Sequence, residues 1–156
     1  MPFGEIELVK LIDNEMKRAG FKRKGKNWYL ETDETVEVVN LQKSQWGNQY
    51  YVNLGILLKA LDQSNTPKEY QCHIRARLND VADEAIDWGK ILDLEDASVV
   101  EEQRATATSN ALRDNALPFL RKMSTTNGIK HELSDKGFGN LAVMQIARRF
   151  LGLPET

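Results

Sequence analysis

The sequence predicts a single α+β domain, with a four- to five-stranded antiparallel sheet and with an N-terminal helix and C-terminal helices packed on one face. Three observations favour this class: an amphipathic N-terminal stripe, short alternating segments separated by turn residues up to about residue 78, and helical composition after residue 97. The length of 156 residues suits one domain, and no repeat or linker divides the chain. We therefore expect one domain over residues 1–156.

The first expected element is an amphipathic helix over residues 5–19. Apolar residues recur there at three- and four-residue spacings, namely Leu8, Leu11, Ile12, Met16 and Ala19. Gly20 follows at the position where a left-handed residue commonly ends a helix.

Three strands joined by two hairpins are expected next. Residues 28–30 form a short strand, and the turn at residues 32–34 leads into a second strand over about residues 36–46. The Gly47 and Asn48 pair favours a tight turn, after which residues 49–58 return as the third strand.

A fourth strand is expected over residues 70–78, because apolar and polar side chains alternate there. One face would carry Cys72, Ile74, Ala76 and Leu78, and the other His73, Arg75 and Arg77. If the apolar face joins the core, the histidine and both arginines lie on the outer face of the sheet.

The remainder of the chain is expected to be mainly helical. Residues 80–88 suggest a short helix, and residues 91–94 a last edge strand. Residues 97–123 have the composition of a long helix that Pro118 must kink or break, since proline has no N–H to donate. A final helix is expected over residues 140–151.

Composition narrows the function classes. The net charge of −2 gives no global attraction to nucleic acid or to an anionic membrane. The single cysteine, Cys72, suits a reducing compartment, so we expect a cytoplasmic protein. Neither a glycine-rich phosphate loop nor a zinc-type cysteine cluster is present, and we expect no cofactor and no metal.

The central hairpin fixes which side chains share a face. If Trp46 pairs with Gln49, Leu41 faces Leu54 on the apolar side. The other face then carries Asn40, Gln42 and Ser44 beside Tyr51, Asn53 and Gly55, with Gln42 directly across from Asn53. Amides are depleted in strands, so this group indicates either a recognition surface, which Gly55 would let a partner approach closely, or an ordinary solvated sheet face.

Two charged groups admit more than one interpretation. Arg75 and Arg77 with His73 would make the amide face receptive to anions, unless the arginines pair with acidic residues of the chain itself. A basic cluster at Lys22, Arg23, Lys24 and Lys26 precedes Trp28 and Tyr29, a composition also found in nucleic-acid binders and in solvated loops. The acidic residues Asp80, Asp83, Glu84 and Asp87 lack the spacing of a calcium loop, which favours a solvated helix face.

Several segments resemble a bacterial family, domain of unknown function DUF4304. They are Gly20–Gly25, Trp28 and Tyr29, Val39–Ser44, Trp46–Ile56, Cys72–Leu78 and Trp88. The likeness covers about the first 90 residues and implies a small bacterial α+β domain, with no established activity or site residue to transfer.

These observations favour a noncatalytic binding module for a protein partner or a small anionic ligand. The expected binding residues are Asn40, Gln42, Tyr51, Asn53, His73, Arg75 and Arg77. The alternatives are an enzyme for an anionic small molecule with His73 as acid or base, and nucleic-acid binding through Lys22–Lys26. We expect neither nucleic-acid nor membrane binding as the main role.

Overall fold

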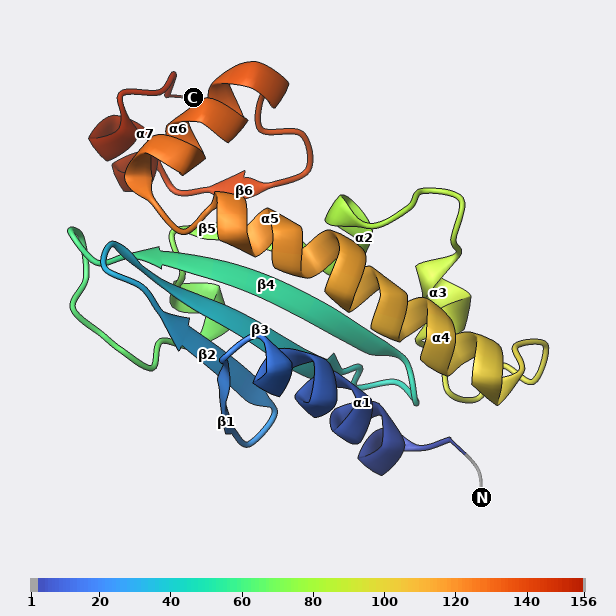
Figure 1. Ribbon diagram of the computed structural model, residues 1–156. Coiled ribbons are helices and arrows are strands. Elements are labelled where there is room, and N and C mark those ends of the chain that lie inside the picture. Colours follow the sequence, from blue (N-terminus) through green and yellow to red (C-terminus); the bar gives the residue numbers. More distant parts are fainter. Residues whose placement is uncertain (1–2, 156) are drawn as a thin grey trace.

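The computed structural model describes residues 3–155 and confirms the α+β class (Figure 1). One sheet of six antiparallel strands follows the order of the chain, β1-β2-β3-β4-β5-β6. The strands are β1 (Lys22–Lys24), β2 (Asn27–Glu31), β3 (Thr35–Lys43), β4 (Tyr50–Leu58), β5 (Ile74–Arg77) and β6 (Ala142–Val143). The sheet exceeds the predicted four or five strands because the edge strands β1 and β6 are too short for alternation to reveal them.

Helix α1 (Glu5–Arg18) matches the first predicted element. Leu8, Ile12 and Met16 are fully buried, as the three- and four-residue spacing requires. At its start the Glu7 carboxylate accepts the Gly4 N–H at 2.9 Å, which satisfies one of the unpaired donors of the first turn. Gly20 follows the helix with a φ of 92°, a conformation that favours glycine.

The β3–β4 hairpin differs from its predicted register by two residues. Asn40 faces Asn53, Gln42 faces Tyr51 and Leu41 faces Val52. Ser44 donates its N–H to the Gln49 carbonyl at 2.8 Å, so a four-residue loop replaces the expected two-residue turn. Because side chains alternate with a period of two, a shift of two changes the partners and leaves each side chain on its predicted face.

Strand β5 is shorter than predicted. A single 3₁₀ turn, η1 (Glu69–Gln71), occupies the start of the predicted strand, and Cys72 and His73 connect that turn to β5. The polar and apolar alternation therefore applies to residues 74–77 and fails for the two residues before them.

The segment after β5 contains two single-turn helices, α2 (Leu78–Val81) and α3 (Trp88–Ile91). The predicted helix over 80–88 is wrong. The predicted edge strand over 91–94 is reduced to one antiparallel bridge, in which Asp93 pairs with Gln49. Asp87 caps α3 by accepting the Lys90 N–H at 3.2 Å, so Trp88 begins a helix and does not end one. The buried Arg104 donates to the carbonyls of Ile91 and Asp93, both at 2.7 Å, and these bonds hold the segment in its turn conformation.

The long helical segment is continuous but irregular. It comprises α4 (Glu101–Ala111), a π-helical turn η2 (Leu112–Ala116) and α5 (Leu117–Lys122), drawn in yellow to orange in Figure 1. The predicted irregularity is present, and it lies in the turn before Pro118. In an α-helix the N–H of residue 118 would bond to the carbonyl of Asp114; proline has no N–H, and the wider turn accommodates this.

The C-terminal part adds α6 (Thr126–Lys136), strand β6 and α7 (Gln145–Leu151). The predicted final helix over 140–151 begins later, because residues 142–143 pair with β5. Helix α6 was not predicted as a separate element. Thr125 caps it by accepting the Gly128 N–H at 3.0 Å.

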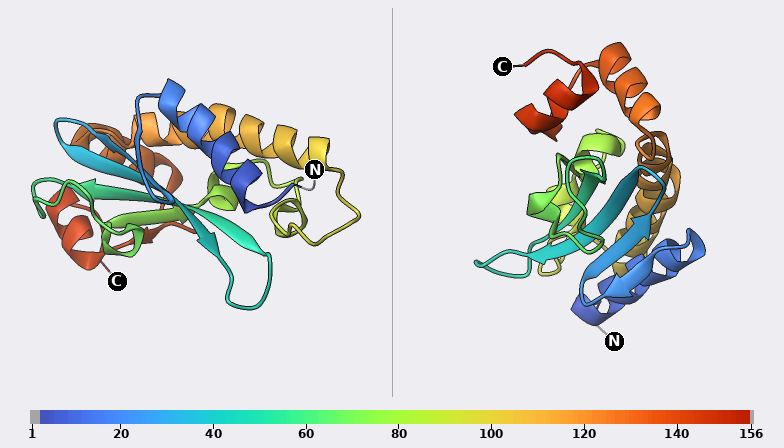
Figure 2. Two further views of the ribbon diagram at one scale, coloured as in Figure 1. Left: turned by 90° about the horizontal axis from the view of Figure 1, so that it is seen from below. Right: turned by 90° about the vertical axis from the view of Figure 1, so that its left-hand side faces the viewer.

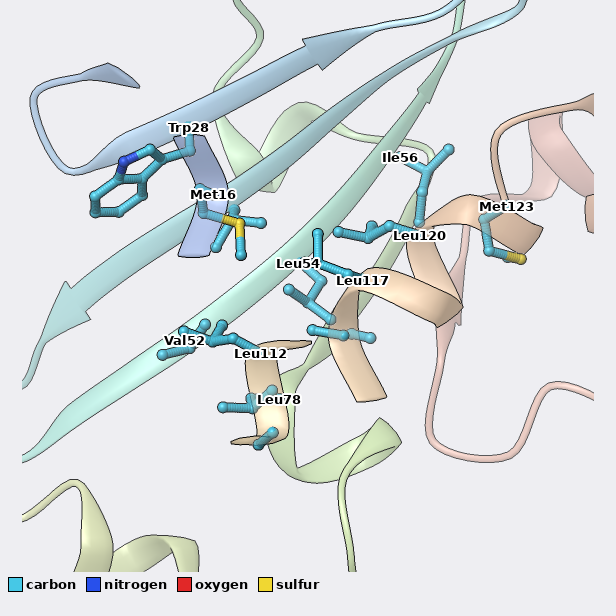
Figure 3. Close-up of a cluster of buried hydrophobic side chains, with 14 of the residues drawn as sticks. Met16, Trp28, Val52, Leu54, Ile56, Leu78, Leu112, Leu117, Leu120 and Met123 are labelled. Atoms are coloured by element: carbon cyan, nitrogen blue, oxygen red, sulfur yellow. The ribbon is translucent and has the colours of Figure 1, made fainter. Parts of the chain in front are cut away.

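The main core lies between one face of the sheet and helices α1, α4 and α5, as predicted (Figure 2). Figure 3 shows Leu54 of β4 packed among Leu117 and Leu120 of α5. A second, small cluster occupies part of the opposite face, where Val36, Val38, Leu57 and Cys72 are buried. The segment between β4 and β5 therefore covers one end of this face, and the other end carries the polar side chains.

Candidate ligand-binding face of the sheet

The uncovered end of the second sheet face carries a row of polar side chains from four adjacent strands. Asn27, Asn40, Asn53 and Arg77 occupy paired positions on β2, β3, β4 and β5. We call these four residues with Gln42 and Tyr51 the polar face. Antiparallel alternation brings them together, since each points away from the main core.

The amides of the polar face form a connected hydrogen-bond network. Asn53 donates through Nδ2 to Asn40 Oδ1 at 3.0 Å and to Gln42 Oε1 at 2.9 Å. Asn40 donates in turn to Asn27 Oδ1 at 2.8 Å. Asn53 is only 5% exposed, whereas Gln42 is exposed. The bonds orient the amides, so Gln42 presents its NH₂ group with no hydrogen-bond partner among residues 3–155.

Arg77 places a guanidinium beside the amides. Its guanidinium carbon lies 4.2 Å from the centroid of the Tyr51 ring, a cation–π contact. Asp80 accepts the backbone N–H of Arg77 at 2.7 Å, but the guanidinium has no ion-pair partner within the described part of the chain. Arg77 is exposed and is therefore available to a ligand.

Arg75 is neutralised by the chain itself. Its Nε and Nη2 atoms donate to the two carboxylate oxygens of Glu69 at 2.9 and 3.2 Å. This hydrogen bonding to the buried Glu69 raises the pKa of the Arg75 guanidinium further. The sequence leaves two interpretations of the arginines open. Arg75 pairs with an acidic residue of the chain, whereas Arg77 forms no ion pair among the described residues.

His73 does not lie with the arginines, contrary to expectation. It is buried, and its Nδ1 accepts the Leu58 N–H at 2.9 Å at the end of β4. Burial lowers the pKa of the imidazole, which favours the neutral form that can accept this bond. His73 precedes β5, so the alternation that places Arg75 and Arg77 does not extend to it.

Cys72 also lies on the opposite side from the one predicted. Its Sγ packs against Gly55, only 2.7 Å from where a Cβ at residue 55 would lie. The space above Gly55 is therefore filled by the chain itself, not left open for a partner as the sequence suggested. Burial raises the pKa of the Cys72 thiol to about 12, so the thiol stays protonated at neutral pH.

A hollow of about 280 Å³ lies over the polar face and is called here the central hollow. Its polar lining consists of Gln42, Asn53, Arg75, Arg77 and Asn140 together with two carboxylates, those of Glu69 and Asp80. Sequence reasoning missed Asp80 and Asn140, which lie in α2 and in the loop before β6. Nothing in their local sequence indicates that the fold brings them to the sheet.

The other charged groups lie away from the central hollow or are solvated. Lys22, Arg23 and Lys24 are exposed on β1, and Lys26 pairs with Glu5 at 3.1 Å. The acidic residues Asp83, Glu84 and Asp87 are exposed. Between residues 3 and 155 no group of three or more His, Cys, Asp or Glu side chains is arranged to hold a metal ion. In the same range, every helix is too short or too polar to cross a membrane.

The fold and the polar face define a small α+β domain built on one antiparallel sheet. The chain belongs to the family described as Domain of unknown function (DUF4304), whose model matches residues 12–122. That match contains β1 to β5 and all six residues of the polar face, and it ends before α6, β6 and α7. Searches of curated proteins and of solved structures found no match.

Proposed function

We propose that the protein is a noncatalytic binding module whose polar face holds a carboxylate-bearing ligand. The observation that carries the proposal is the exposed Arg77 guanidinium, which is stacked on Tyr51 and free of any ion pair among the described residues. A guanidinium offers a planar fork of donors that matches a carboxylate.

The neighbouring amides support the same ligand class. Gln42 and Arg77 line the same hollow, and the NH₂ group of Gln42 is unpaired. Asn53 fixes the orientation of Gln42, so little conformational entropy is lost when a ligand accepts from it. Glu69 is already engaged by Arg75, which leaves Arg77 as the cation available to an incoming anion.

The proposal excludes catalysis because of the state of His73 and Cys72, the two reactive side chains that directly precede β5. His73 uses Nδ1 as an acceptor within the fold, and Cys72 is a buried, protonated thiol. The single thiol also supports the inference of a cytoplasmic setting, and the family resemblance supports that of a bacterial source.

The proposal is tested by NMR titration with N-acetyl-glutamate N-methylamide, with the neutral glutamine analogue as the matched ligand. We expect saturable shifts of the Gln42 and Asn53 side-chain amide signals with the glutamate compound alone. Arg77→Gln should weaken the binding at least tenfold. Arg121→Gln, an exposed arginine on α5 outside the central hollow, should not change it. Equal binding of both compounds, or equal effects of both substitutions, would contradict the proposal.

A further inference from the structure

Arg77 also lines a second hollow, which differs from the central hollow in chemistry. The volume of this second hollow is about 190 Å³, and we call it the aromatic hollow because Tyr51 and Trp88 line it. Gln49 and Asn79 are its uncharged polar residues, and the rest of its lining is mainly apolar. The arginine that carries the proposed function therefore borders an aromatic site as well as a polar one.

The aromatic hollow lies where β5 ends beside β4. Strand β5 pairs with β4 only through residues 53–56, so Tyr51 lies on a part of β4 that β5 does not reach. The chain continues instead into α2, and the end of α3 approaches the start of β4, where Tyr50 donates its N–H to the Leu92 carbonyl at 2.8 Å. Residues of β4, α2 and α3 consequently line the hollow.

The aromatic hollow is also free of acidic residues. Within residues 3–155, Arg77 is the only charged residue in its lining. The lining of the central hollow, in contrast, includes the carboxylates of Glu69 and Asp80. Because like charges repel, an anion that meets Arg77 in the aromatic hollow encounters no opposing carboxylate in the lining.

The size and the walls of the aromatic hollow suit one aromatic ring. Trp88 is only 7% exposed, and the Tyr51 ring is held by the Arg77 guanidinium, whose carbon lies 4.2 Å from the ring centroid. Aromatic rings attract one another in offset-stacked and edge-to-face arrangements. A cavity of about 150 Å³ holds benzene, so a hollow of about 190 Å³ has room for a six-membered ring.

We propose that the ligand of Arg77 is an aryl carboxylate, with its ring in the aromatic hollow and its carboxylate on the guanidinium. The ring packs against Tyr51 and Trp88, and the carboxylate accepts from the planar fork of Arg77. Since Arg77 itself lines the hollow, few atoms separate the ring from the carboxylate, and we expect zero to two methylene groups. This inference rests on the proposed carboxylate site and adds the aromatic ring to it.

NMR titration of the full chain with three aryl carboxylates tests the inference. Benzoate, phenylacetate and 3-phenylpropionate differ only in the number of methylene groups between ring and carboxylate. Acetate is the control without a ring, and the amide of each acid is the control without a charge. We expect the best of the three acids to bind at least tenfold more tightly than acetate and than its own amide.

The indole N–H of Trp88 reports where the ring binds. This buried N–H has no hydrogen-bond acceptor among residues 3–155, and Trp88→Phe identifies its signal among those of the three tryptophans. We expect the signal to shift with the aryl carboxylates. Nuclear Overhauser effects should connect the ring protons of the ligand to the Trp88 indole.

Protein variants assign the two ends of the ligand. Arg77→Gln should weaken binding of the best acid at least tenfold. Asn79→Trp should place a competing indole in the aromatic hollow and reduce the preference over acetate to less than threefold. Asn127→Trp is the matched control, because Asn127 is exposed on α6 and lines neither hollow. It should bind like the natural protein.

The outcomes distinguish the aryl carboxylate from the carboxylate site alone. Binding that depends on charge and on Arg77 but is equal for acetate and the aryl acids overturns the aryl inference and leaves the carboxylate site intact. Binding that is indifferent to both charge and Arg77 overturns both. If no aryl carboxylate binds, the aryl inference is wrong, and the titration with N-acetyl-glutamate N-methylamide decides the carboxylate site independently. The comparison among ligands uses the natural protein, so it holds even if Asn79→Trp disturbs the fold.

Discussion

Asn53 lies directly across the β3–β4 pair from Asn40 and donates its side-chain amide to Asn40 Oδ1 at 3.0 Å. The same NH₂ group reaches Gln42 at 2.9 Å, so one buried side chain satisfies two acceptors. The hydrogen bonds of the polar face therefore contribute to the stability of the sheet, and the polar face is also a candidate recognition surface. A substitution meant to test ligand binding must therefore avoid Asn53.

Replacing Asn53 by alanine should lower the free energy of unfolding by about 1 to 3 kcal/mol, because partly buried acceptors on Asn40 and Gln42 lose their donor. Urea denaturation measures this loss. Gln45→Ala, in the exposed hairpin loop, is the control and should change stability by less than about 0.5 kcal/mol. Equal stability of the two variants would show that the network contributes nothing.

Gly55→Ala should destabilise the fold by about 1 to 3 kcal/mol, since the new methyl group would lie 2.7 Å from Cys72 Sγ. Cys72→Ala in the same chain should recover part of that loss by removing the sulfur atom. A double-mutant cycle measured by thermal unfolding gives the coupling between the two positions. Additive effects would mean that residues 55 and 72 do not compete for space.

The buried carboxyl group of Glu37 should make stability fall with rising pH. Burial raises the pKa of the Glu37 carboxyl group from its ordinary value of 4.5 to about 8 in the folded protein, and among residues 3–155 its Oε2 has no hydrogen-bond partner. The folded state therefore binds the proton more tightly than the unfolded state. Its contribution is fully present below pH 4.5 and is lost as pH rises towards 8, with a limiting slope of about 1.4 kcal/mol per pH unit.

Glu37→Gln isolates this contribution, because the amide has a similar shape and does not titrate. From pH 5 to pH 8 the unfolding free energy of the natural protein should fall relative to that of the variant. Urea denaturation across that range measures it. A constant difference would mean that Glu37 ionises normally in the folded state.

The thiol of Cys72 should resist Ellman's reagent for as long as the protein is folded. It is buried, and its pKa of about 12 leaves almost no thiolate at pH 8. Gln45→Cys supplies an exposed thiol in the same molecule, which should react at once. Fast reaction of both thiols without denaturant would contradict the packing of Cys72 against Gly55.

Alternation in the sequence was sufficient to place Gln42, Asn53 and Arg77 on one face, although the turn type and the register were wrong. A register error of two residues preserves the face of every side chain, so the predicted faces of Gln42 and Asn53 are correct despite the error. The same reasoning failed at Cys72 and His73, because a 3₁₀ turn precedes β5 and the strand period does not apply there.

Other parts of the central hollow had no local signal. Asn140 reaches the sheet only because β6, a strand of two residues, pairs with β5 from far along the chain. Asp80 lies in a helix of a single turn, which is too short for apolar periodicity to define. The sequence could locate the irregularity near Pro118, but a π-helical turn and a simple kink have the same sequence signature.

The two edges of the sheet determine how a partner can approach. Strand β1 presents three consecutive cations, Lys22, Arg23 and Lys24, and β6 offers only two residues of backbone. Short, lysine-rich edges discourage a foreign strand from adding to a sheet, and they guard against edge-to-edge aggregation. β-Augmentation, in which main-chain hydrogen bonds supply affinity with little regard to sequence, is thereby disfavoured. A partner that binds this domain would instead lie across the face of the sheet and be selected by its side chains.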